Sequence, residues 1–320
     1  MKAVVQHRYG PPDVLRIEEV EPPTPGDDEI LIHVRATTVS QSDTHARGAH
    51  PFAWRFVAGL RRPRWRWLGV EFAGVVEAVG RAVTEFHVGD EVFGQPARFF
   101  GAHAEYIVLP ESAPVTAKPV SLTFEEAAAV GDGSSQALDA LRQAKAEPGS
   151  RIAIYGASGS LGTAAVQIAK HRGAHVTGIC GPTHLELVRS LGADEVVDYT
   201  KEDFRRAGPV FDAVIDAVGK YAFVRARRAL RPGGIYVATD AGPHGESLLM
   251  AIPARFVGSR RLVFAMGRRS KEHLVFMREL VDAGAYRPVI DRRYPLDQVV
   301  DAHRRVETWH KTGNVVLVMP

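Results

Sequence analysis

Cysteine is nearly absent from this chain, since Cys180 is the single thiol among 320 residues. One thiol excludes an internal disulfide and any zinc site built from several cysteines. No uninterrupted apolar run approaches the roughly eighteen residues that a membrane-spanning helix needs. The opening residues, MKAVVQHRYGPP, also lack the apolar stretch of a signal peptide. We therefore expect a cytoplasmic protein with no membrane partner.

A strong excess of charge of either sign is missing as well. Lys and Arg number 40 and Asp and Glu number 37, which gives a formal net charge of +3. Because these charges are scattered along the chain, they do not form the basic footprint of a nucleic-acid-binding protein, and we expect no nucleic-acid partner. The hydrophobic share of 45% and the charged share of 24% are ordinary for a soluble globular protein. The length predicts two domains.

Two kinds of hydrophobic periodicity divide the chain. Short alternating stretches, such as EILIHVRATTV at 29–39, fill the first hundred residues and are interrupted by proline and glycine. This alternation predicts a compact antiparallel β domain. From Arg151 onward, apolar strands such as RIAIY, HVTGIC and FDAVID alternate with helical stretches, which predicts an α/β region with a parallel sheet. A later helix, EHLVFMRELVDAG, and the strand NVVLVM suggest that the chain returns to the first domain.

Three glycines, Gly156, Gly159 and Gly162, follow the apolar strand at 152–155 and open a helix rich in small residues. Free amides at a helix N-terminus bind phosphate groups. In such a turn, Gly159 lets a ligand approach the backbone, and Gly162 lets the helix lie close to the strand. We therefore predict a dinucleotide site that includes these glycines together with Ser158, Ser160 and Leu161. A simple tight connection is the alternative.

The end of the next strand distinguishes NAD from NADP, because an acid there binds the ribose hydroxyls of NAD. The sequence VTGICGPTHLE has Cys180 and Gly181 at that place and no acid before Glu186. An absent carboxylate removes repulsion against a 2'-phosphate, and His184 can donate a hydrogen bond to it, so NADPH is favoured over NADH. Thr183 and Glu186 also fit a capping box, so this segment has the alternative role of starting a helix. We interpret Cys180 as a small residue at a strand end.

The order and spacing of GDEVFG, FEEAAAV, PGSRIAIYGASGSLGTAAVQIAK, SLGADEVVDY, FDAVIDAVG and RPGGIYV resemble the medium-chain dehydrogenase/reductase family. The likeness is strongest to its zinc-independent, quinone oxidoreductase-like branch, whose members are often named NAD(P)-dependent alcohol dehydrogenases. It implies a GroES-like β domain over 1–118, a Rossmann domain with a doubly wound parallel sheet over 119–264, and a return to the first domain over 265–320. It also implies a nucleotide cleft between the domains and a homodimer.

Two departures from the zinc-containing members of this family suggest that zinc is absent. Ser40 stands where those members carry a cysteine, and Val70 stands where they carry a histidine, although Glu71 is kept. The four-cysteine lobe of the structural zinc is missing too. Asp43, His45 and Glu71 are the residues of a residual metal site, but they lack a thiolate or imidazole at the expected places, so we expect no metal.

A zinc-free cleft favours some hydride acceptors over others. A ketone needs its developing alkoxide stabilised by a Lewis acid or a strong donor, whereas a quinone or conjugated enone spreads the charge over a longer π system. We therefore expect NADPH-dependent hydride transfer to a quinone or an α,β-unsaturated carbonyl. A ketone or alcohol dehydrogenase, an enoyl reductase, and a non-catalytic NADPH-sensing or RNA-binding module are the alternatives.

The resemblance also implies site residues. It places the segment from Ser40 to His45 beside the nicotinamide, where Ser40 donates a hydrogen bond to the substrate oxygen and His45 relays a proton. Turn and N-cap roles for Ser40, Ser42 and Asp43, and a surface role for His45, are the alternatives. On the cofactor side the resemblance adds three places along the chain, which are Tyr199, the run Ala217, Val218 and Gly219, and Asn314.

One segment, LRRPRWRWLG at 60–69, interleaves arginines with Trp65 and Trp67. Such a pattern can stack on and clamp a nucleic acid or lie on an anionic membrane. The family commonly has a basic loop at this place, so a mobile flap over a bulky or anionic substrate is the favoured interpretation. A plain surface loop is the third possibility.

Overall fold

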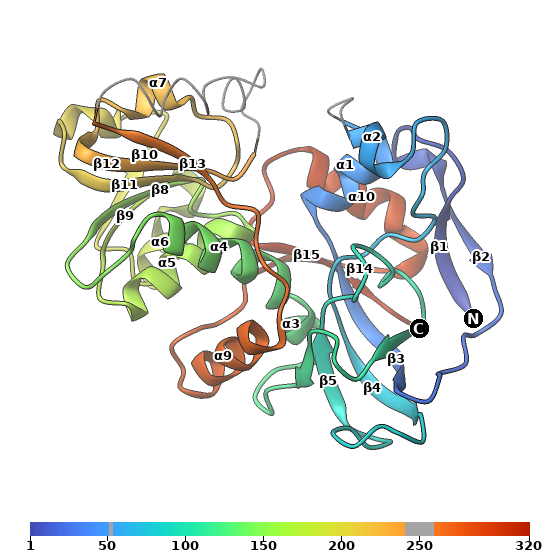
Figure 1. Cartoon of the computed structure of the whole chain (residues 1–320). Helices are drawn as coiled ribbons and strands as arrows, with labels where there is room; N and C mark the ends of the chain where they lie inside the picture. Colours follow the sequence, from blue (N-terminus) through green and yellow to red (C-terminus); the bar gives the residue numbers. More distant parts are fainter. Residues whose placement is uncertain (51–53, 241–258) are drawn as a thin grey trace. The chain divides into compact units, whose positions relative to one another are not determined.

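The structure, a computed structural model, describes residues 1–50, 54–240 and 259–320 (Figure 1). It divides into two units. The first unit comprises Met1–Asp132 and Arg269–Pro320, and the second comprises Gly133–Arg268. No helix within the described ranges has the length and apolarity that crossing a bilayer requires.

The first unit is built on a seven-stranded sheet with the order β14-β15-β3-β4-β5-β7, and β6 pairs with β3 beside this path. All of its pairings are antiparallel except that of β14 with β15. The strands are β3 (Glu29–Val39), β4 (Phe72–Val79), β5 (Glu91–Gly94), β6 (Tyr106–Pro110), β7 (Val115–Ala117), β14 (Ile290–Pro295) and β15 (Asn314–Val318). A separate hairpin pairs β1 (Lys2–Gln6) with β2 (Leu15–Glu19).

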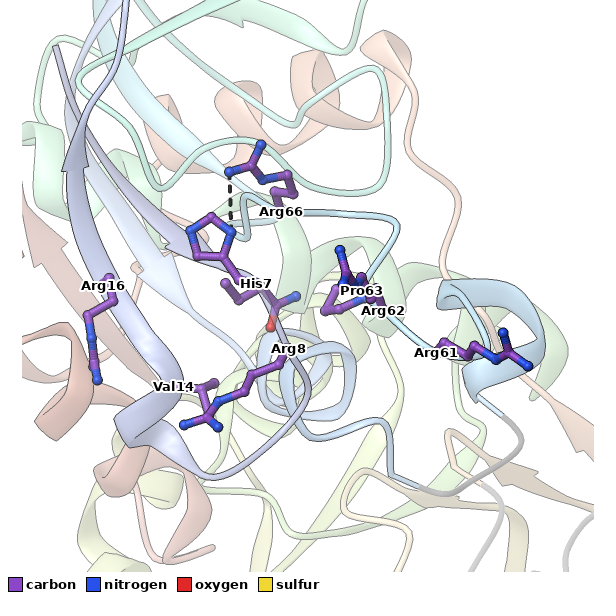
Figure 2. A pocket seen from close by; sticks show the side chains of 9 residues that line it. His7, Arg8, Val14, Arg16, Arg61, Arg62, Pro63 and Arg66 are labelled. Atoms are coloured by element: carbon purple, nitrogen blue, oxygen red, sulfur yellow. Dashed lines mark hydrogen bonds between the residues drawn. The ribbon is translucent and has the colours of Figure 1, made fainter.

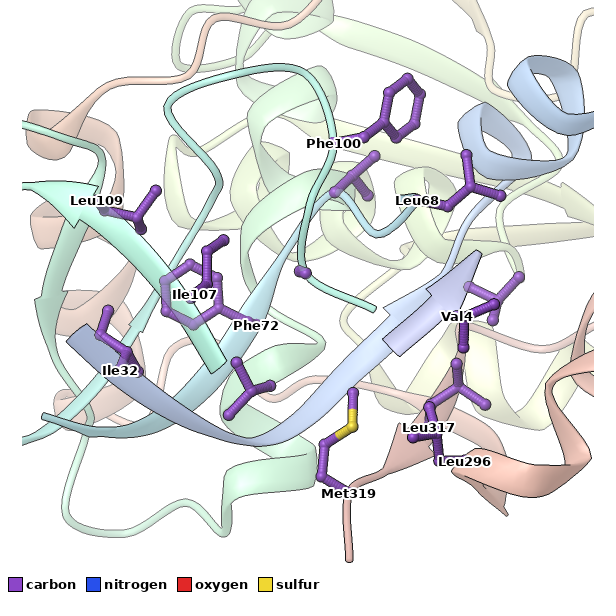
Figure 3. Packing of buried hydrophobic residues seen from close by; sticks show 14 of the residues in the cluster. Val4, Ile32, Leu68, Phe72, Phe100, Ile107, Leu109, Leu296, Leu317 and Met319 are labelled. Atoms are coloured by element: carbon purple, nitrogen blue, oxygen red, sulfur yellow. The ribbon is translucent and has the colours of Figure 1, made fainter. Parts of the chain in front are cut away.

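Alternating side chains of these strands form the core of the first unit. Ile30 and Ile32 of β3 are fully buried together with Phe72 of β4 and Leu317 of β15. Figure 3 shows this packing, with Met319 at its edge. The helices of this unit are α1 (Gln41–Gly48), α2 (Trp54–Ala58), α3 (Phe124–Ala128), α9 (Lys271–Asp282) and α10 (Val299–Glu307), with 3-10 turns η1 (Pro12–Val14) and η5 (Leu296–Gln298).

The second unit contains a six-stranded sheet with the order β10-β9-β8-β11-β12-β13, and every pairing in it is parallel. Its strands are β8 (Arg151–Tyr155), β9 (His175–Cys180), β10 (Glu195–Asp198), β11 (Phe211–Asp216), β12 (Leu230–Ala238) and β13 (Arg261–Phe264). The strand order reverses between β8 and β11. In doubly wound sheets, ligands bind at the carboxyl ends of the strands at such a reversal.

Helices cover both faces of the parallel sheet. The helices α5 (Ser160–His171) and α6 (Leu185–Ser190) lie on one face, and α7 (Phe223–Ala226) lies on the other (Figure 1). The described residues also include α4 (Gly131–Gln143), η2 (Pro182–His184) and η3 (Phe204–Ala207). The predicted fold class, an antiparallel β domain with a Rossmann-type parallel sheet, is confirmed. The domain boundaries expected at 118 and 264 stay predictions.

Candidate functional site

The predicted glycine turn lies at the carboxyl end of β8 and leads into α5. Gly156 adopts a positive φ of 82°, and a Cβ there would lie 2.5 Å from Cγ1 of Val218. Its amide donates to the Ile179 carbonyl oxygen at 2.9 Å, which joins the turn to β9. Gly156 is therefore required by the backbone conformation and by close packing.

Gly162 and Gly159 differ in what a side chain would meet. A Cβ at Gly162 would lie 2.1 Å from the Gly156 carbonyl oxygen and 2.7 Å from Cα of Ala157, so α5 contacts the turn through bare backbone. At Gly159, whose φ of −79° suits any residue, the nearest atom would be the Gly156 oxygen at 3.6 Å. The protein's own packing does not demand glycine at 159. The space beside it is suited to a ligand that lies against the backbone.

The helix α5 begins at this space. Gly159 is its N-cap, and no side chain caps the helix. Ser158 and Ser160 are half-buried in the turn, and Leu161 is buried under the first helical turn. An α-helix without a side-chain cap presents its first amides and the positive end of its dipole to an anion.

The end of β9 carries the next predicted group. Cys180 is the last residue of this strand and is buried, and burial raises the pKa of its thiol to about 11. Gly181 follows, and His184 is half-buried in η2. The capping-box interpretation of Thr183 is wrong, because η2 begins directly after Gly181 with Pro182 at its first position. As a result, His184 is the N-cap of α6, and this helix has no side-chain cap.

Two further strand ends complete this edge of the sheet. Tyr199 follows β10, is 48% exposed, and its amide donates to the Cys180 carbonyl oxygen at 3.2 Å. After β11, the amide of Ala217 donates to the Tyr155 carbonyl oxygen at 2.9 Å. Val218 packs against Gly156, and Gly219 adopts a positive φ of 62°. The register pairs Asp198 with Cys180, Tyr155 with Ile179 and Asp216 with Tyr155, so all four strand ends lie side by side.

Sequence reasoning missed two carboxylates at this edge. Asp216 is buried and its Oδ2 accepts from the Tyr221 amide and the Tyr236 hydroxyl, both at 2.9 Å. Burial raises the pKa of Asp216 to about 6 in spite of these bonds. Asp198 accepts from the amide and hydroxyl of Thr200, and these bonds lower its pKa. Each of these aspartates is the last residue of its strand. An acidic residue at the end of an apolar stretch can be seen in the sequence, and this pattern could have identified both.

In the first unit, Ser40 and Asp43 form a capping box at the start of α1. The Ser40 amide donates to Asp43 Oδ2 at 2.8 Å, the Ser40 hydroxyl donates to the same oxygen at 2.9 Å, and the Asp43 amide donates to Ser40 Oγ at 3.3 Å. Asp43 Oδ1 accepts from the Gly69 amide at 2.7 Å. His45 is half-buried on the same helix, with its Nε2 lying 3.3 Å from Gln41 Nε2. The capping role is therefore present, and the catalytic roles stay predictions.

A buried polar cluster lies close to the sheet of this unit. Glu71 accepts from the Thr38 hydroxyl and from the Asp132 amide, both at 2.5 Å. Burial, followed by the charge of Asp132, raises the pKa of Glu71 to about 8. Burial lowers the pKa of the Lys311 ammonium to about 8, although Asp291, Asp132 and Glu71 oppose this shift. Sequence reasoning missed Lys311, which lies 240 positions from Glu71.

Asn314 begins β15 and is buried. Its side-chain amide donates to the Ala129 carbonyl oxygen at 3.1 Å and to the Val289 carbonyl oxygen at 3.2 Å. These bonds join the last strand to α3 and to the segment before β14. A cofactor role for Asn314 stays a prediction, and the geometry shows a structural role.

In the part of the chain that the structure describes, no group of three or more His, Cys, Asp or Glu side chains is arranged to hold a metal ion. The carboxylates of Asp43 and Glu71 each accept hydrogen bonds from neighbouring backbone amides. Zinc independence stays a prediction.

Known proteins resemble this chain in sequence and in structure. Residues 26–120 match the family described as "Alcohol dehydrogenase GroES-like domain", and residues 191–317 match "Zinc-binding dehydrogenase". A 2-methylene-furan-3-one reductase of Solanum lycopersicum is 33% identical over 99% of this chain and 79% of its own length. An NADPH-dependent alkenal/one oxidoreductase of Arabidopsis thaliana is 31% identical with the same coverage. A quinone oxidoreductase structure from Coxiella burnetii is 28% identical with a TM-score of 0.88, covering 100% of this chain and 99% of that one.

Proposed function

Since the chain belongs to the quinone oxidoreductase-like branch of the medium-chain dehydrogenase/reductase family, we propose that it is an NAD(P)H-dependent oxidoreductase that reduces a quinone or an α,β-unsaturated carbonyl. Two relatives whose names state reduction of a furanone and of alkenals or alkenones support this acceptor class. The oxidoreductase activity, rather than a sensing or RNA-binding role, accords with these relatives.

The open space beside Gly159 is the observation that carries the proposal. A glycine that the protein's own packing does not require, placed at an uncapped helix N-terminus, fits the pyrophosphate of a dinucleotide. The residues that would hold the cofactor are those of the turn and of the neighbouring strand ends: Gly156, Ser158, Gly159, Ser160, Leu161, Gly162, Cys180, Gly181, His184, Tyr199, Ala217, Val218 and Gly219. Asn314 is the candidate from the other unit.

We favour NADPH over NADH at this edge. The strand β9 ends in Cys180 and Gly181, so it does not itself carry the carboxylate with which NAD enzymes bind the ribose hydroxyls, although Asp198 of β10 pairs with Cys180. His184 follows that place in the chain, and the Tyr199 hydroxyl lies 3.6 Å from where a Cβ of Gly181 would stand, so both offer hydrogen-bond donors to a 2'-phosphate. The Arabidopsis relative that is named as NADPH-dependent supports this preference.

Reduced nicotinamide supplies the hydride, and the chain's own residues bind, orient and protonate. The amides at the start of α5 bind phosphate, while the buried small residues of this helix keep it rigid against the sheet. In our proposal His45 relays the proton that the reduced acceptor takes up, and Ser40 donates a hydrogen bond to the acceptor oxygen. Ser40 must release Asp43 Oδ2 to do so, because its hydroxyl donates to that oxygen.

Zinc independence, a homodimeric assembly and a cytoplasmic location complete the proposal. Conjugated acceptors suit a site without a Lewis acid, because their developing charge is delocalised. Activity that survives a strong chelator would support zinc independence, and activity lost on chelation and restored by zinc would contradict it. Sedimentation measures the assembly state directly.

The cofactor site is tested by Gly159→Ala, with Gly26→Ala as the matched control. A Cβ at Gly26 would meet only the flexible Glu29 side chain, far along the chain from the turn. We expect Gly159→Ala to raise the Kd for NADPH by about tenfold or more, because the methyl group occupies the space of the ligand. The free energy of unfolding should change by less than about 0.5 kcal/mol in both variants. Unchanged NADPH binding in Gly159→Ala would remove the observation on which the proposal depends.

The acceptor class is tested by the consumption of NADPH with a naphthoquinone, an enone and a simple aldehyde. We expect turnover of the quinone or the enone, and little turnover of the aldehyde. Turnover of the aldehyde alone would instead favour a ketone or alcohol dehydrogenase. Tight NADPH binding with no turnover of any acceptor would favour a sensing protein.

A further inference from the structure

A cavity of about 740 Å³ in the first unit has a lining dominated by arginine. Figure 2 shows its lining residues, which come from the β1–β2 hairpin and from the loop that follows α2. The basic side chains that line it, apart from His7, are Arg8, Arg16, Arg61, Arg62 and Arg66. We propose that this cavity binds a phosphate-bearing anion, at a site built from different residues than the nucleotide edge of the second unit.

The charge of these arginines is not neutralised by the protein. Within the described residues, none of the five forms an ion pair with a carboxylate, whereas Arg81, Arg205 and Arg305 are paired. Arg16 donates to the carbonyl oxygens of Asp13 and Leu15, and Arg66 lies 3.3 Å from His7 Nδ1. All five side chains are exposed to solvent. A group of like charges this dense repels itself unless an anion joins it.

Two acids flank Arg16 in the sequence, and each has a partner other than the five arginines. Glu18 accepts a hydrogen bond from His7 Nε2 at 2.6 Å. Asp13 Oδ1 accepts from Arg304 at 2.6 Å. Asp13 is thus turned to Arg304, whereas Glu18 is held beside the cavity by the lining residue His7. The five arginines outnumber this one carboxylate, so the cavity keeps a net positive charge.

The loop that carries Arg61, Arg62 and Arg66 is fixed by backbone hydrogen bonds. The Gln6 amide donates to the Arg66 carbonyl oxygen at 2.8 Å, and Gln6 Nε2 donates to the Trp65 carbonyl oxygen at 2.9 Å. At its other end the Arg64 amide donates to the Ala58 carbonyl oxygen at 2.6 Å. The loop expected from the sequence to act as a flap is therefore joined to β1, and its backbone needs little ordering when its arginines bind a ligand.

The start of this loop is a tight turn that only glycine allows. Gly59 adopts a positive φ of 113°, and a Cβ there would lie 2.2 Å from the Arg62 carbonyl oxygen. The Tyr9 hydroxyl lies 2.7 Å from the carbonyl oxygens of both Ala58 and Gly59. The hairpin side and the loop side of the cavity are thus held together, which is a feature of a preformed binding site.

The chemistry of the lining selects phosphate. Guanidinium groups present planar pairs of donors that match phosphate oxygens in a bidentate manner. The volume lies in the range of small-molecule sites and fits a nucleotide or a short polyphosphate. Trp65 does not line the cavity, because its ring packs against Phe100 with centroids 5.3 Å apart. Without an aromatic stacking platform in the lining, a small phosphorylated ligand is favoured over single-stranded nucleic acid.

Tripolyphosphate is the probe, titrated calorimetrically into the full-length protein with saturating NADP⁺ present to occupy the nucleotide edge. The test variant is the double substitution Arg62→Gln with Arg66→Gln. The matched control is Arg292→Gln with Arg293→Gln, which removes the same charge from two adjacent exposed arginines of β14. We expect the test variant to weaken binding by at least about tenfold and the control by less than about twofold. Thermal unfolding of both variants checks that they remain folded.

Three results would overturn the proposal. These are no tripolyphosphate binding by the wild type at low salt, an equal loss in the test and control variants, and tighter binding of a single-stranded oligonucleotide that loses affinity in the same variant. The binding measurement needs no turnover, so its failure is independent of a failure of the proposed activity.

The same variants distinguish two sources of the phosphate. If the phosphate belongs to the acceptor's tail, the test variant raises the KM for a phosphorylated enone and leaves that for the unphosphorylated enone unchanged. If it belongs to a separate ligand, the test variant binds tripolyphosphate more weakly than the wild type, and neither KM changes.

Discussion

The two units build their polar sites in opposite ways. At the edge of the parallel sheet, the polar groups are mainly backbone amides, and the side chains are small or absent, as at Gly156, Gly159 and Gly162. In the first unit, the polar groups are side chains such as Asp43 and Glu71, which are buried and accept several hydrogen bonds. A backbone site fails when a side chain is added, whereas a side-chain site fails when one is removed.

The largest expected effect comes from adding a methyl group where α5 contacts the turn. Gly162→Ala places a Cβ 2.1 Å from the Gly156 carbonyl oxygen, and only movement of the backbone relieves this overlap. We expect the free energy of unfolding to fall by about 3 kcal/mol, and NADPH binding to be lost. Urea unfolding of Gly162→Ala beside Gly159→Ala measures the difference. A decrease of less than about 1 kcal/mol in the free energy of unfolding would show that the backbone of the turn moves at little cost.

The next effect comes from removing a side chain in the first unit. Asp43→Ala leaves the amides of Ser40 and Gly69 without their acceptor in a fully buried place. We expect a loss of about 2 kcal/mol in urea unfolding. Asp28→Ala, at an exposed carboxylate, is the control and should change stability by less than about 0.5 kcal/mol. Equal losses in the two variants would mean that the buried carboxylate contributes nothing specific.

Glu71 sharpens the comparison through pH. Its pKa is raised from the ordinary value near 4.5 to about 8, so between these pH values the unfolded chain releases the proton that the folded chain keeps. Glu71 therefore makes its full contribution to stability below about pH 4.5, and this contribution is lost as the pH rises towards 8. Over this range the free energy of unfolding falls by at most about 1.4 kcal/mol per pH unit. Glu71→Gln should flatten this decline, and the exposed control Glu77→Gln should retain it. Parallel pH profiles for wild type and Glu71→Gln would contradict the assignment.

The smallest effect is expected at Thr183. The helix α6 begins at Leu185 without a side-chain cap, so Thr183→Ala should change the free energy of unfolding by less than about 0.5 kcal/mol. A functional helix cap would lose about 1 kcal/mol. Thr123→Ala is the positive control, because Thr123 caps α3 with Glu126 in a reciprocal box. A loss at Thr183 equal to that at Thr123 would restore the capping role.

Local signals allowed the glycine turn between β8 and α5 to be predicted and left the side-chain cluster around Glu71 hidden. The strand, the glycine spacing and the helix of residues 151–171 are neighbours in the chain, so their geometry follows from their order. The contact between Glu71 and the amide of Asp132 joins positions 61 residues apart, and Lys311 joins from the far end of the chain. Hydrophobic periodicity does not predict such long-range contacts, because they depend on strand pairing across the whole sheet.

Short-range competition explains the local errors. Pro182 starts η2 directly after Gly181, which moves the start of α6 past the threonine that the capping pattern had selected. Turn and N-cap roles for Ser40 and Asp43 were among the alternatives in the sequence, whereas the bond from the Gly69 amide to Asp43 was not foreseeable.

The position of β15 between β14 and β3 affects the order in which the protein folds during its synthesis. Val316 pairs with Thr38, so a strand that lies beside β3 is synthesised only after the whole second unit. The second unit, Gly133–Arg268, is continuous and emerges earlier. We expect it to fold first during translation, while the edge of β3 that pairs with β15 stays unpaired until the segment after the second unit has emerged. We therefore expect chaperones to bind mainly at this unpaired edge of β3.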